Sequence, residues 1–436
     1  MKKINLLLTI TFLLFSITIK SQEVVLLTKT EVITKISKKN LTLKISEQEF
    51  QKSKADYLQT NAVYLPTITA SHTSISTTNP LMAFGSKLNQ EILTAADFNP
   101  TLLNNPSQTQ NFATKIEVKQ PLINLDGFYQ RKAAKSKMAA MSLKTKRTED
   151  YLMFEVEKAY MQLQLAYKAV EVLKKALESV NANKKTADNR FNQGLLQRTD
   201  VLSVEIRVSE VKSQLQTANS NVQNASNYLS FLMNDESDVV YKPTENLSVS
   251  NFNVNDKNIS ENRADIKAMQ LASKGYEAIN KADKMAFLPR LNAFGSYELY
   301  DNKLFQGSAN GYLIGVQLSW DIFQGSKRYG KVQKSKAEFE KSKLEYDQYV
   351  SKSNLELNKV KRQLVDAKNR LELTNLAVKQ SKESLRIRKN RFKEGLEKTS
   401  DLLIAETQFA QKELEHYQTI YKYNLTKTSL EFLTKE

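Results

Sequence analysis

The feature that most constrains the fold of this chain is a long stretch, residues 128–192, that contains neither proline nor glycine. Apolar residues recur along it at the spacing of one helix face. They are Tyr151, Phe154, Tyr160, Leu163, Ala166, Tyr167, Val170, Leu173, Leu177 and Val180. One continuous helix over this stretch would be on the order of 100 Å long. Such a helix must pack lengthwise against equally long partners, in coiled-coil fashion, rather than form the wall of one compact domain.

The end of this stretch belongs to a sequence that occurs twice. Residues 189–202 read NRFNQGLLQRTDVL and residues 390–403 read NRFKEGLEKTSDLL, with a glycine, an aspartate and the closing leucine in register. Each copy joins a very long helical pattern to a shorter one through a glycine-centred turn, which predicts the tip of an antiparallel helical hairpin. The second long pattern covers residues 326–393, and the shorter patterns cover 199–233 and 400–433.

The duplication and the composition predict four segments. Residues 1–21 open with two lysines and continue into an apolar block, as a secretory signal peptide does. Residues 22–234 form a first structural repeat of helix, two strands with a long external loop, long helix and helix. Residues 235–260, rich in asparagine and serine, form a linker wrapped on the outside of the helices. Residues 261–436 form the second repeat.

Four segments have the composition or the alternation of strands. Residues 65–77 are rich in threonine, serine and β-branched residues, and residues 112–118, 291–299 and 312–322 alternate along the chain with a period of two. Each predicted strand has about ten residues, the length needed to cross a bilayer at a tilt. No segment after the signal peptide offers the roughly 18 consecutive apolar residues of a membrane helix. If the mature chain spans a membrane, it must therefore do so as strands of a closed barrel.

Two other segments lie beside the first strands. Residues 22–61 carry apolar residues near helical spacing, which predicts one amphipathic helix of roughly 30 residues that ends before Pro66. Residues 78–110 contain three prolines and several asparagines, which predicts an exposed loop longer than a hairpin requires. The apolar run at 81–84 favours either a folded-over external lid or packing against a neighbouring subunit.

The predicted lengths indicate how these elements combine. The helix before each strand pair and the helix after each tip together match the long helix in length, so the two shorter helices could stack end to end beside it. Four strands cannot close a membrane barrel, because small barrels need about eight or more. Self-association is therefore required, and three copies would supply twelve strands.

Composition excludes several classes of protein. The chain has no cysteine, which removes disulfides, thiolate chemistry and an N-terminal lipid anchor. Its two histidines, His72 and His416, give no basis for a catalytic imidazole or a histidine-rich metal site. The formal charge of +17 comes from lysines spread along amphipathic helices, so nucleic acid is not predicted as a partner. The sequence shows no catalytic set, phosphate-binding loop or metal-ligand spacing, so neither an enzyme nor a cofactor is predicted.

Short motifs recur at matched places in the two repeats. They are YLP at 64–66 and FLP at 287–289, QPLINLDG at 120–127 and IFQG at 322–325, RADIKA at 263–268, and the two tips. In this order they resemble the TolC-like outer membrane efflux protein family, over essentially the whole mature chain. The resemblance implies a mainly α fold with a small β part. Duplicated long antiparallel helical hairpins would form an α-barrel tunnel, and four strands per chain would contribute to a twelve-stranded transmembrane β-barrel in a homotrimer.

The resemblance also implies a function. The expected protein is the passive exit duct of a tripartite efflux or type I secretion system. It lies in the lipid of the cell outer membrane, has a large periplasmic extension, and works with a periplasmic adaptor protein and an inner-membrane pump of RND or ABC type. Family ducts serve drugs, metal ions, proteins and polysaccharides, so the cargo follows the pump rather than the fold. The alternative function is a periplasmic coiled-coil adaptor or scaffold, which has no need for lipid-facing strands.

Asp200 and Asp401 occupy equivalent places at the starts of two helices, each after a hydroxyl residue. A cap at Thr199 or Ser400 with an acid in the first turn would satisfy free amides and the helix dipole. The resemblance implies that Asp401 lies in the narrow periplasmic entrance, where three symmetry-related acids favour cations and can tighten the pore. Family members often carry a further acid where this chain has Ile404. Capping is favoured for Asp200, whereas capping and a pore-facing gate are equal alternatives for Asp401.

Gly194 and Gly395 are expected to serve the turns themselves, because positive φ is easily adopted only by glycine. The resemblance places both tips at the contact with the adaptor. Four side chains there could dock this partner or, alternatively, pack within the chain or lie in solvent: Arg190, Phe191, Arg391 and Phe392.

The strand segments carry two further sets of candidate residues. Tyr297, Tyr312 and Trp320 fit an aromatic girdle at the lipid interface, with core packing as the alternative. A polar channel lining is predicted for Lys115, Glu117, Lys119, Glu298 and Asp321.

Overall fold

The structure is a computed structural model, and it describes residues 23–237, 239–250 and 258–436. The predicted signal peptide at residues 1–21 lies outside the described residues. The chain divides into two compact units. The helical unit comprises the residues up to Ser46, Thr145–Ala264 and Val350–Glu436; the sheet unit comprises Glu47–Lys144 and Asp265–Tyr349.

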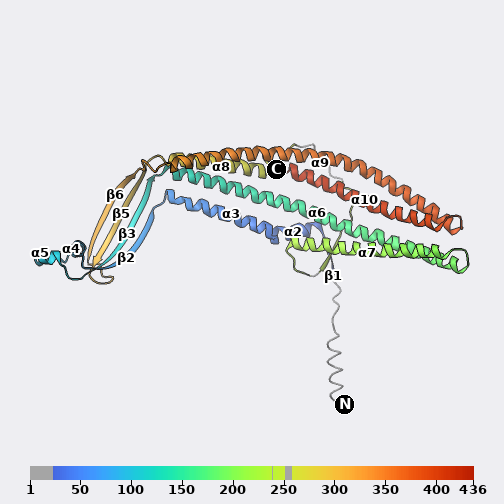
Figure 1. The fold of residues 1–436 in the computed structure, drawn as a ribbon, viewed down its shortest axis with the longest axis horizontal. Coiled ribbons are helices and arrows are strands. Elements are labelled where there is room, and N and C mark those ends of the chain that lie inside the picture. The colour runs from blue at the N-terminus through green and yellow to red at the C-terminus, as the bar shows by residue number, and fades with distance from the viewer. Residues whose placement is uncertain (1–22, 238, 251–257) are drawn as a thin grey trace, which may run out of the picture. The chain divides into compact units, whose positions relative to one another are not determined.

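Four long helices dominate the chain (Figure 1). α6 (Leu125–Asn192) has 68 residues and α9 (Lys327–Lys393) has 67. α7 (Arg198–Met233) and α10 (Thr399–Thr434) have 36 residues each. The predicted long helices and the shorter helices after the tips are therefore confirmed. Because the long stretches contain no proline, the ladder of backbone hydrogen bonds continues without a break.

In the helical unit, α6 and α7 pack against each other as the two arms of a hairpin. Val180 and Ala187 of α6 are buried against Val204, Val208 and Val211 of α7. The α7 residues follow one another at intervals of four and three positions, so they lie on one face of that helix. This face-to-face packing confirms the predicted hairpin.

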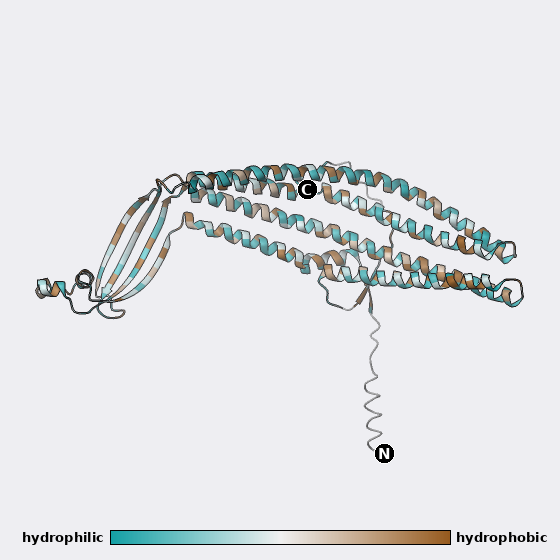
Figure 2. Cartoon of the chain, viewed as in Figure 1, coloured by the Kyte–Doolittle hydropathy of each residue, from teal (hydrophilic) through white to brown (hydrophobic). Residues whose placement is uncertain are grey.

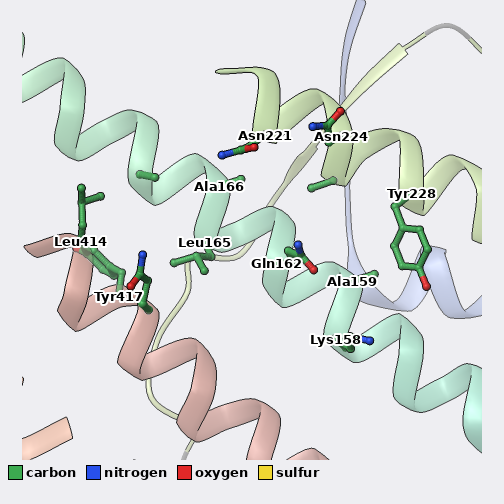
Figure 3. Close-up of a pocket in the computed structure, with 13 residues that line it drawn as sticks. Lys158, Ala159, Gln162, Leu165, Ala166, Asn221, Asn224, Tyr228, Leu414 and Tyr417 are labelled. Carbon is green, nitrogen blue, oxygen red and sulfur yellow. The ribbon is translucent and has the colours of Figure 1, made fainter. Parts of the chain in front are cut away.

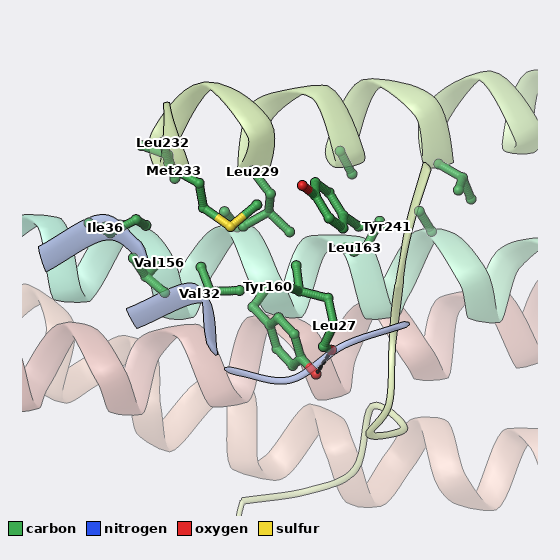
Figure 4. Packing of buried hydrophobic residues seen from close by; sticks show 14 of the residues in the cluster. Leu27, Val32, Ile36, Val156, Tyr160, Leu163, Leu229, Leu232, Met233 and Tyr241 are labelled. Carbon is green, nitrogen blue, oxygen red and sulfur yellow. Dashed lines mark hydrogen bonds between the residues drawn. The ribbon is translucent and has the colours of Figure 1, made fainter. Parts of the chain in front are cut away.

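The largest buried cluster joins this hairpin to the N-terminal segment (Figure 4). Tyr160 and Leu163 of α6 are buried together with Leu229 and Met233 of α7. The hydroxyl of Tyr160 donates a hydrogen bond of 3.0 Å to the carbonyl oxygen of Leu27. Full burial of each large apolar side chain contributes about 1.5–3 kcal/mol. The cluster therefore anchors the start of the described chain to the helices.

The prediction of one continuous helix over residues 22–61 is wrong, because this segment contains a strand and two separate helices. β1 (Glu23–Leu27) pairs in parallel with β4 (Val239–Pro243), which lies inside the predicted linker. Thr28 then begins α2 (Lys29–Lys39) through a capping box. A parallel pair leaves no turn in the sequence to reveal it, because its two strands are far apart along the chain.

Asn40 separates α2 from α3 (Leu41–Gln59), which a short 3-10 helix follows, η1 (Thr60–Val63). The Asn40 amide nitrogen donates to the carbonyl oxygen of Leu232 at 2.8 Å, and its amide oxygen accepts from the backbone N–H of Leu43 at 3.1 Å. Asn40 is buried, so these two bonds satisfy groups that water does not reach. The side chain therefore fixes the break and caps the last turn of α7.

The end of α10 is capped in an equivalent way. Arg263, directly before α8 (Ala264–Met285), donates to the carbonyl oxygen of Leu433 at 3.0 Å and to the hydroxyl of Ser353 at 2.8 Å. Leu433 follows the second tip by as many positions as Leu232 follows the first. A side chain therefore caps the last turn of the shorter helix in each repeat.

The sheet unit contains one antiparallel sheet of four strands in the order β2-β3-β5-β6. The strands are β2 (Thr67–Thr77), β3 (Thr109–Ile123), β5 (Arg290–Asp301) and β6 (Ala309–Ser319). All four predicted strands are confirmed. β6 ends earlier than predicted, so Trp320 follows the strand rather than lying in it.

The register places the predicted residue sets on common faces of the sheet. Ile116 lies opposite Tyr297, and Tyr297 lies opposite Tyr312. On the other face, Lys115 lies opposite Glu298. Figure 2 shows apolar residues recurring along the strands. The apolar face exposes large side chains, including Ile68, Ile116, Tyr312, Ile314, Val316 and Leu318.

The segment between β2 and β3 was predicted as a loop, and it folds into short helices instead. These are α4 (Pro80–Asn89), η2 (Ala95–Phe98) and α5 (Pro100–Asn104). Proline stands at the first position of α4 and of α5, where its missing N–H costs nothing. Asn79 and Asn99 cap these two helices through their side chains. The prolines and asparagines that predicted a loop are therefore helix-start signals here.

One ion pair fixes this helical segment internally. The ammonium of Lys87 lies 2.8 Å from a carboxylate oxygen of Asp97. This contact, together with hydrogen bonds from Thr94, lowers the pKa of Asp97 to about 2.

Among the helices of the described residues, none combines the length and the apolar character needed to cross a membrane.

Candidate functional site at the helical tips

The two tips have the same backbone turn. Gly194 has a φ of +73° and Gly395 a φ of +77°, both in the left-handed region that favours glycine. The N–H of Gly194 donates to the carbonyl oxygen of Phe191 at 2.9 Å, and the N–H of Gly395 donates to that of Phe392 at 3.0 Å. A Cβ added at either glycine would meet no described atom within 4 Å. Backbone conformation rather than space therefore requires glycine, and the predicted turns are confirmed.

The first tip uses its acid as a cap. α7 begins at Arg198, so its N-cap is Gln197 and not Thr199 as predicted. The backbone N–H of Gln197 donates to a carboxylate oxygen of Asp200 at 3.3 Å. Asp200 also lies in the first helical turn, where a negative charge is favourable. The contact supports capping for Asp200, but the hydroxyl residue is not the cap.

The acid of the second tip has different partners. α10 begins at Thr399 after Lys398, so Ser400 is not the cap either, and no side chain caps this helix. The side chain of Asp401 is 41% exposed and lies 3.9 Å from the guanidinium of Arg388. Arg388 is held more closely by Glu397, at 2.7 Å. The Asp401 carboxylate is thus loosely paired and accessible to solvent.

A cation also links the two tips. Arg190 of α6 donates to the carbonyl oxygen of Lys393 at 2.6 Å, and its guanidinium lies 4.8 Å from the ring centre of Phe392. Phe392 is 3% exposed, so it packs within the chain, which is the alternative weighed for it. Phe191 is 38% exposed, and the side chain of Arg391 is also exposed. Of the four candidate docking residues, Phe191 and Arg391 are therefore the exposed ones.

One buried acid behind the second tip was missed by the sequence analysis. Glu406 of α10 accepts hydrogen bonds from Ser179 and Asn183 of α6, at 2.7 and 2.5 Å. Burial raises the pKa of this carboxyl, and the hydrogen bonds and nearby cations only partly oppose the shift. The sequence pattern that could have revealed Glu406 is a glutamate close to apolar residues, such as Ala405 and Ala410, on the buried side of a helix.

The aromatic candidates lie on or beside the sheet. Tyr297 and Tyr312 face each other across β5 and β6 on the apolar face, and both are exposed. Trp320, just beyond β6, is exposed too, and its indole N–H donates to the carbonyl oxygen of Phe287 at 2.9 Å. Exposed aromatic rings that carry a polar group suit an interface between lipid and water, and in Trp320 this group is held by a hydrogen bond.

The opposite face of the sheet carries the predicted polar set. Lys115 and Glu298 form an ion pair of 3.1 Å across the strands, and Lys119 and Glu117 form another of 3.1 Å. The remaining member, Asp321, lies beyond the end of β6. The structure therefore brings four of these five side chains together on one polar face.

The helical unit also contains a hollow of about 600 Å³, lined by α6, α7 and α10 (Figure 3). Lys158 at its edge lies 3.1 Å from Glu155, which neutralises it. The remaining polar and aromatic wall residues are Gln162, Asn221, Asn224, Tyr228, Tyr417 and Gln418.

Among the described residues, no group of three or more His, Cys, Asp or Glu side chains could hold a metal ion.

Comparisons with known proteins match the whole arrangement. The family described as outer membrane efflux protein matches residues 32–235 and 257–434 of the chain. No curated protein matches the sequence.

Solved structures have the same fold at low sequence identity. A membrane protein from Pseudomonas aeruginosa is 16% identical, with a TM-score of 0.81 over 93% of each chain. The CmeC outer membrane channel of Campylobacter jejuni is 19% identical, with a TM-score of 0.79 over 93% of this chain and 85% of that one. The outer membrane protein VceC of Vibrio cholerae is 16% identical, with a TM-score of 0.78 over 93% and 96%.

Proposed function

The chain belongs to the outer membrane efflux protein family, and we propose that it is the exit duct of a tripartite efflux or type I secretion system. One observation carries this proposal beyond the family match. The same chain combines a four-stranded sheet that has one apolar and one ion-paired face with helices of 67 and 68 residues. A lipid-facing wall and a long helical conduit are the two parts that such a duct needs.

The sheet supports self-association. In the order β2-β3-β5-β6, the strands β2 and β6 are edges with unpaired backbone groups. In lipid these groups must be satisfied, and the edge strands of further copies are suited to do so. We propose a homotrimer in which twelve strands close in the outer membrane, with Tyr297, Tyr312 and Trp320 at its lipid interface. The pair of Lys115 and Glu298 would then face the lumen.

The helical unit is proposed to extend into the periplasm, with its tips toward the partner proteins. There the periplasmic adaptor would contact Phe191 and Arg391, which are exposed. Arg190 and Phe392 support the same surface from beneath, because the guanidinium stacks on the buried ring. An inner-membrane pump completes the machine, and its class determines the cargo.

Asp401 is proposed as the gate acid. Its carboxylate is accessible and only loosely paired with Arg388, so in a trimer three such groups could ring the entrance and attract cations. For Asp200, the contact with the backbone of Gln197 supports capping instead. The tip would open when adaptor and pump engage it.

A fractionation experiment tests the proposed function. The expected protein leaves membranes only with detergent, has the mass of a trimer by light scattering, and forms ion-conducting pores in planar bilayers. A soluble monomer without conductance would contradict the duct and favour the periplasmic scaffold. The scaffold is disfavoured because it has no use for a sheet with an exposed apolar face.

A further inference from the structure

One helix of the sheet unit lies across the polar face of the sheet. Figure 1 shows α4 at the end of the sheet where β2 ends and β3 begins. The side-chain nitrogen of Gln90, which directly follows α4, donates to the carbonyl oxygen of Gln110 at 2.9 Å and to the side-chain oxygen of Asn111 at 2.8 Å. Asn111 precedes Lys115 by four positions, so both side chains point to the polar face. α4 also contacts β6, so it crosses from β3 over β5 to β6.

The burial of the strand ends shows the same placement of α4. At the start of β3, Thr109 and Asn111 are buried, whereas Gln110 between them is exposed. Ala309 at the start of β6 is 1% exposed, and the strand register places it on the same face as Asn111. At this end of the sheet the polar face is therefore covered and the apolar face is open.

The side of α4 that points away from the sheet is apolar. Ala83, Ser86 and Gln90 are buried, and their spacing of three and four positions places them on the side toward the sheet. Leu81 and Leu88 are seven positions apart on the opposite side, and they are 81% and 56% exposed. An exposed apolar helix side of this kind indicates a contact with another molecule.

We propose that the apolar side of α4 packs against the same side of α4 in the other two copies of the trimer, so that three helices close the outer mouth of the duct. The inference rests on the proposed trimer with a polar lumen. Because α4 covers the polar face, it lies inside such a barrel, and threefold symmetry brings Leu81 and Leu88 of the three copies together around the axis. The external lid and the packing against a neighbouring subunit, both considered for residues 81–84, are then one arrangement.

Size and charge support the other copies as the occupant. Neighbouring strands lie about 4.8 Å apart, so a ring of twelve tilted strands is on the order of 20–25 Å across. A helix with its side chains is about 10–12 Å across, so three helices fill such a mouth. The charged residues of 80–104 are Lys87, Glu91 and Asp97, and Lys87 is paired with Asp97. Little charge repulsion therefore opposes contact between the copies.

A lipid surface is the alternative occupant of an apolar helix side. The side chains proposed to face lipid, such as Ile116 and Tyr312, lie on the sheet face opposite to α4. A helix inside the barrel does not reach this lipid. The placement of α4 therefore favours the other copies of the chain.

Disulfide cross-linking of the full-length protein in outer membranes tests the contact. The chain has no cysteine, so Leu88→Cys introduces one thiol per copy. Under mild oxidation, two copies should form a covalent dimer that a reductant returns to single chains. Gln110→Cys is the matched control, because Gln110 is exposed at the same end of the sheet but on its other face. Absence of the Leu88→Cys dimer, or an equal yield from Gln110→Cys, would overturn the inference.

Labelling from the cell surface tests closure without involving the helical tips. Lys119 lies on the polar face eight positions beyond Asn111, so Lys119→Cys places a thiol in the lumen behind α4. In intact cells a small thiol reagent should label it readily, whereas a maleimide on a bulky polymer should label it slowly. Adding Leu81→Gln and Leu88→Gln should raise the rate for the bulky reagent and leave the rate for the small one unchanged. Gln110→Cys should be labelled equally in both backgrounds.

The outcomes separate this inference from the proposed function. If the bulky reagent labels Lys119→Cys at one rate with and without the two glutamines, in a protein that is trimeric and conducts ions, α4 does not close the mouth. The inference then fails while the duct stands. A protein that neither forms trimers nor conducts ions contradicts the duct itself, and the inference with it.

Discussion

The two tips share a sequence and a backbone turn, yet their side chains lie in different environments. Phe191 is 38% exposed, whereas its equivalent Phe392 is 3% exposed. The φ angles of Gly194 and Gly395 differ by only a few degrees. Duplication therefore preserves the turn, and packing of a few side chains makes the copies unequal.

The acidic residues show the same divergence. Asp200 accepts a backbone N–H at its own helix start, whereas Asp401 lies loosely beside Arg388 in solvent. Glu205 forms exposed ion pairs, whereas Glu406 is buried against the other hairpin. This difference between the acids of the two tips indicates that the contacts on which the proposed gating would depend lie at the second tip.

The largest expected difference between the tips concerns their phenylalanines. Phe392→Ala should lower the free energy of unfolding by about 3–5 kcal/mol, because a buried ring leaves a cavity. Phe191→Ala at the first tip should cost about 1 kcal/mol or less, because its ring is already partly solvated. Thermal or denaturant unfolding of both variants measures the difference. Equal losses would contradict the inequality of the tips.

Substitution of the two tip glycines, in contrast, should lower the free energy of unfolding by equal amounts. Gly194→Ala and Gly395→Ala each place a Cβ at positive φ, which costs about 1–2 kcal/mol. No described atom crowds either position, so the cost is conformational and should be the same in both unfolding experiments. A much larger loss at one tip would show that its turn has another function.

The sequence predicted those parts of the tips that depend on local geometry. Helical periodicity located α6 and α9, and a glycine between two helical patterns located each turn, because both signals lie in neighbouring residues. The pairing of β1 with β4 was missed, since its strands meet only in the folded chain. The break at Asn40 was missed for a similar reason, because its side chain bonds to Leu232 of another helix.

The environments of the candidate functional residues also depend on contacts that form only in the folded chain. Phe191 and Phe392 occupy identical positions in the repeated sequence, so only the surrounding packing reveals which ring is buried. The same holds for Glu205 and Glu406. Helix caps were misplaced by two positions, because Thr199 and Ser400 have the favoured chemistry while the helices begin at Arg198 and Thr399.

A smaller effect is expected in the pH dependence of stability. Since burial raises the pKa of Glu406 in the folded state, folding favours its protonated form. Its contribution to stability is therefore greatest below the usual pKa of a glutamate and is lost as pH rises through the raised value. One proton gives a slope of at most about 1.4 kcal/mol per pH unit. Melting curves over this range should lose the slope in Glu406→Gln but not in Glu205→Gln.

The smallest expected effect is the loss of the first-tip cap. Asp200→Ala should lower stability by about 0.3–1 kcal/mol, because it removes a carboxylate from the first turn of α7. Asp200→Asn, which keeps an acceptor for the N–H of Gln197, should recover part of this loss. Unfolding midpoints of the two variants provide the measurement, and identical midpoints would remove the capping role.

The most direct test of the account compares the two aspartates in one measurement, single-channel conductance and ion preference of the trimer in planar bilayers. Asp401→Ala should change the conductance and weaken the preference for cations, because it removes three charges from the proposed entrance. Asp200→Ala should leave both unchanged, because its carboxylate serves the backbone of its own helix. Unchanged conductance and cation preference in Asp401→Ala, or an equal change in both variants, would contradict the proposed gate.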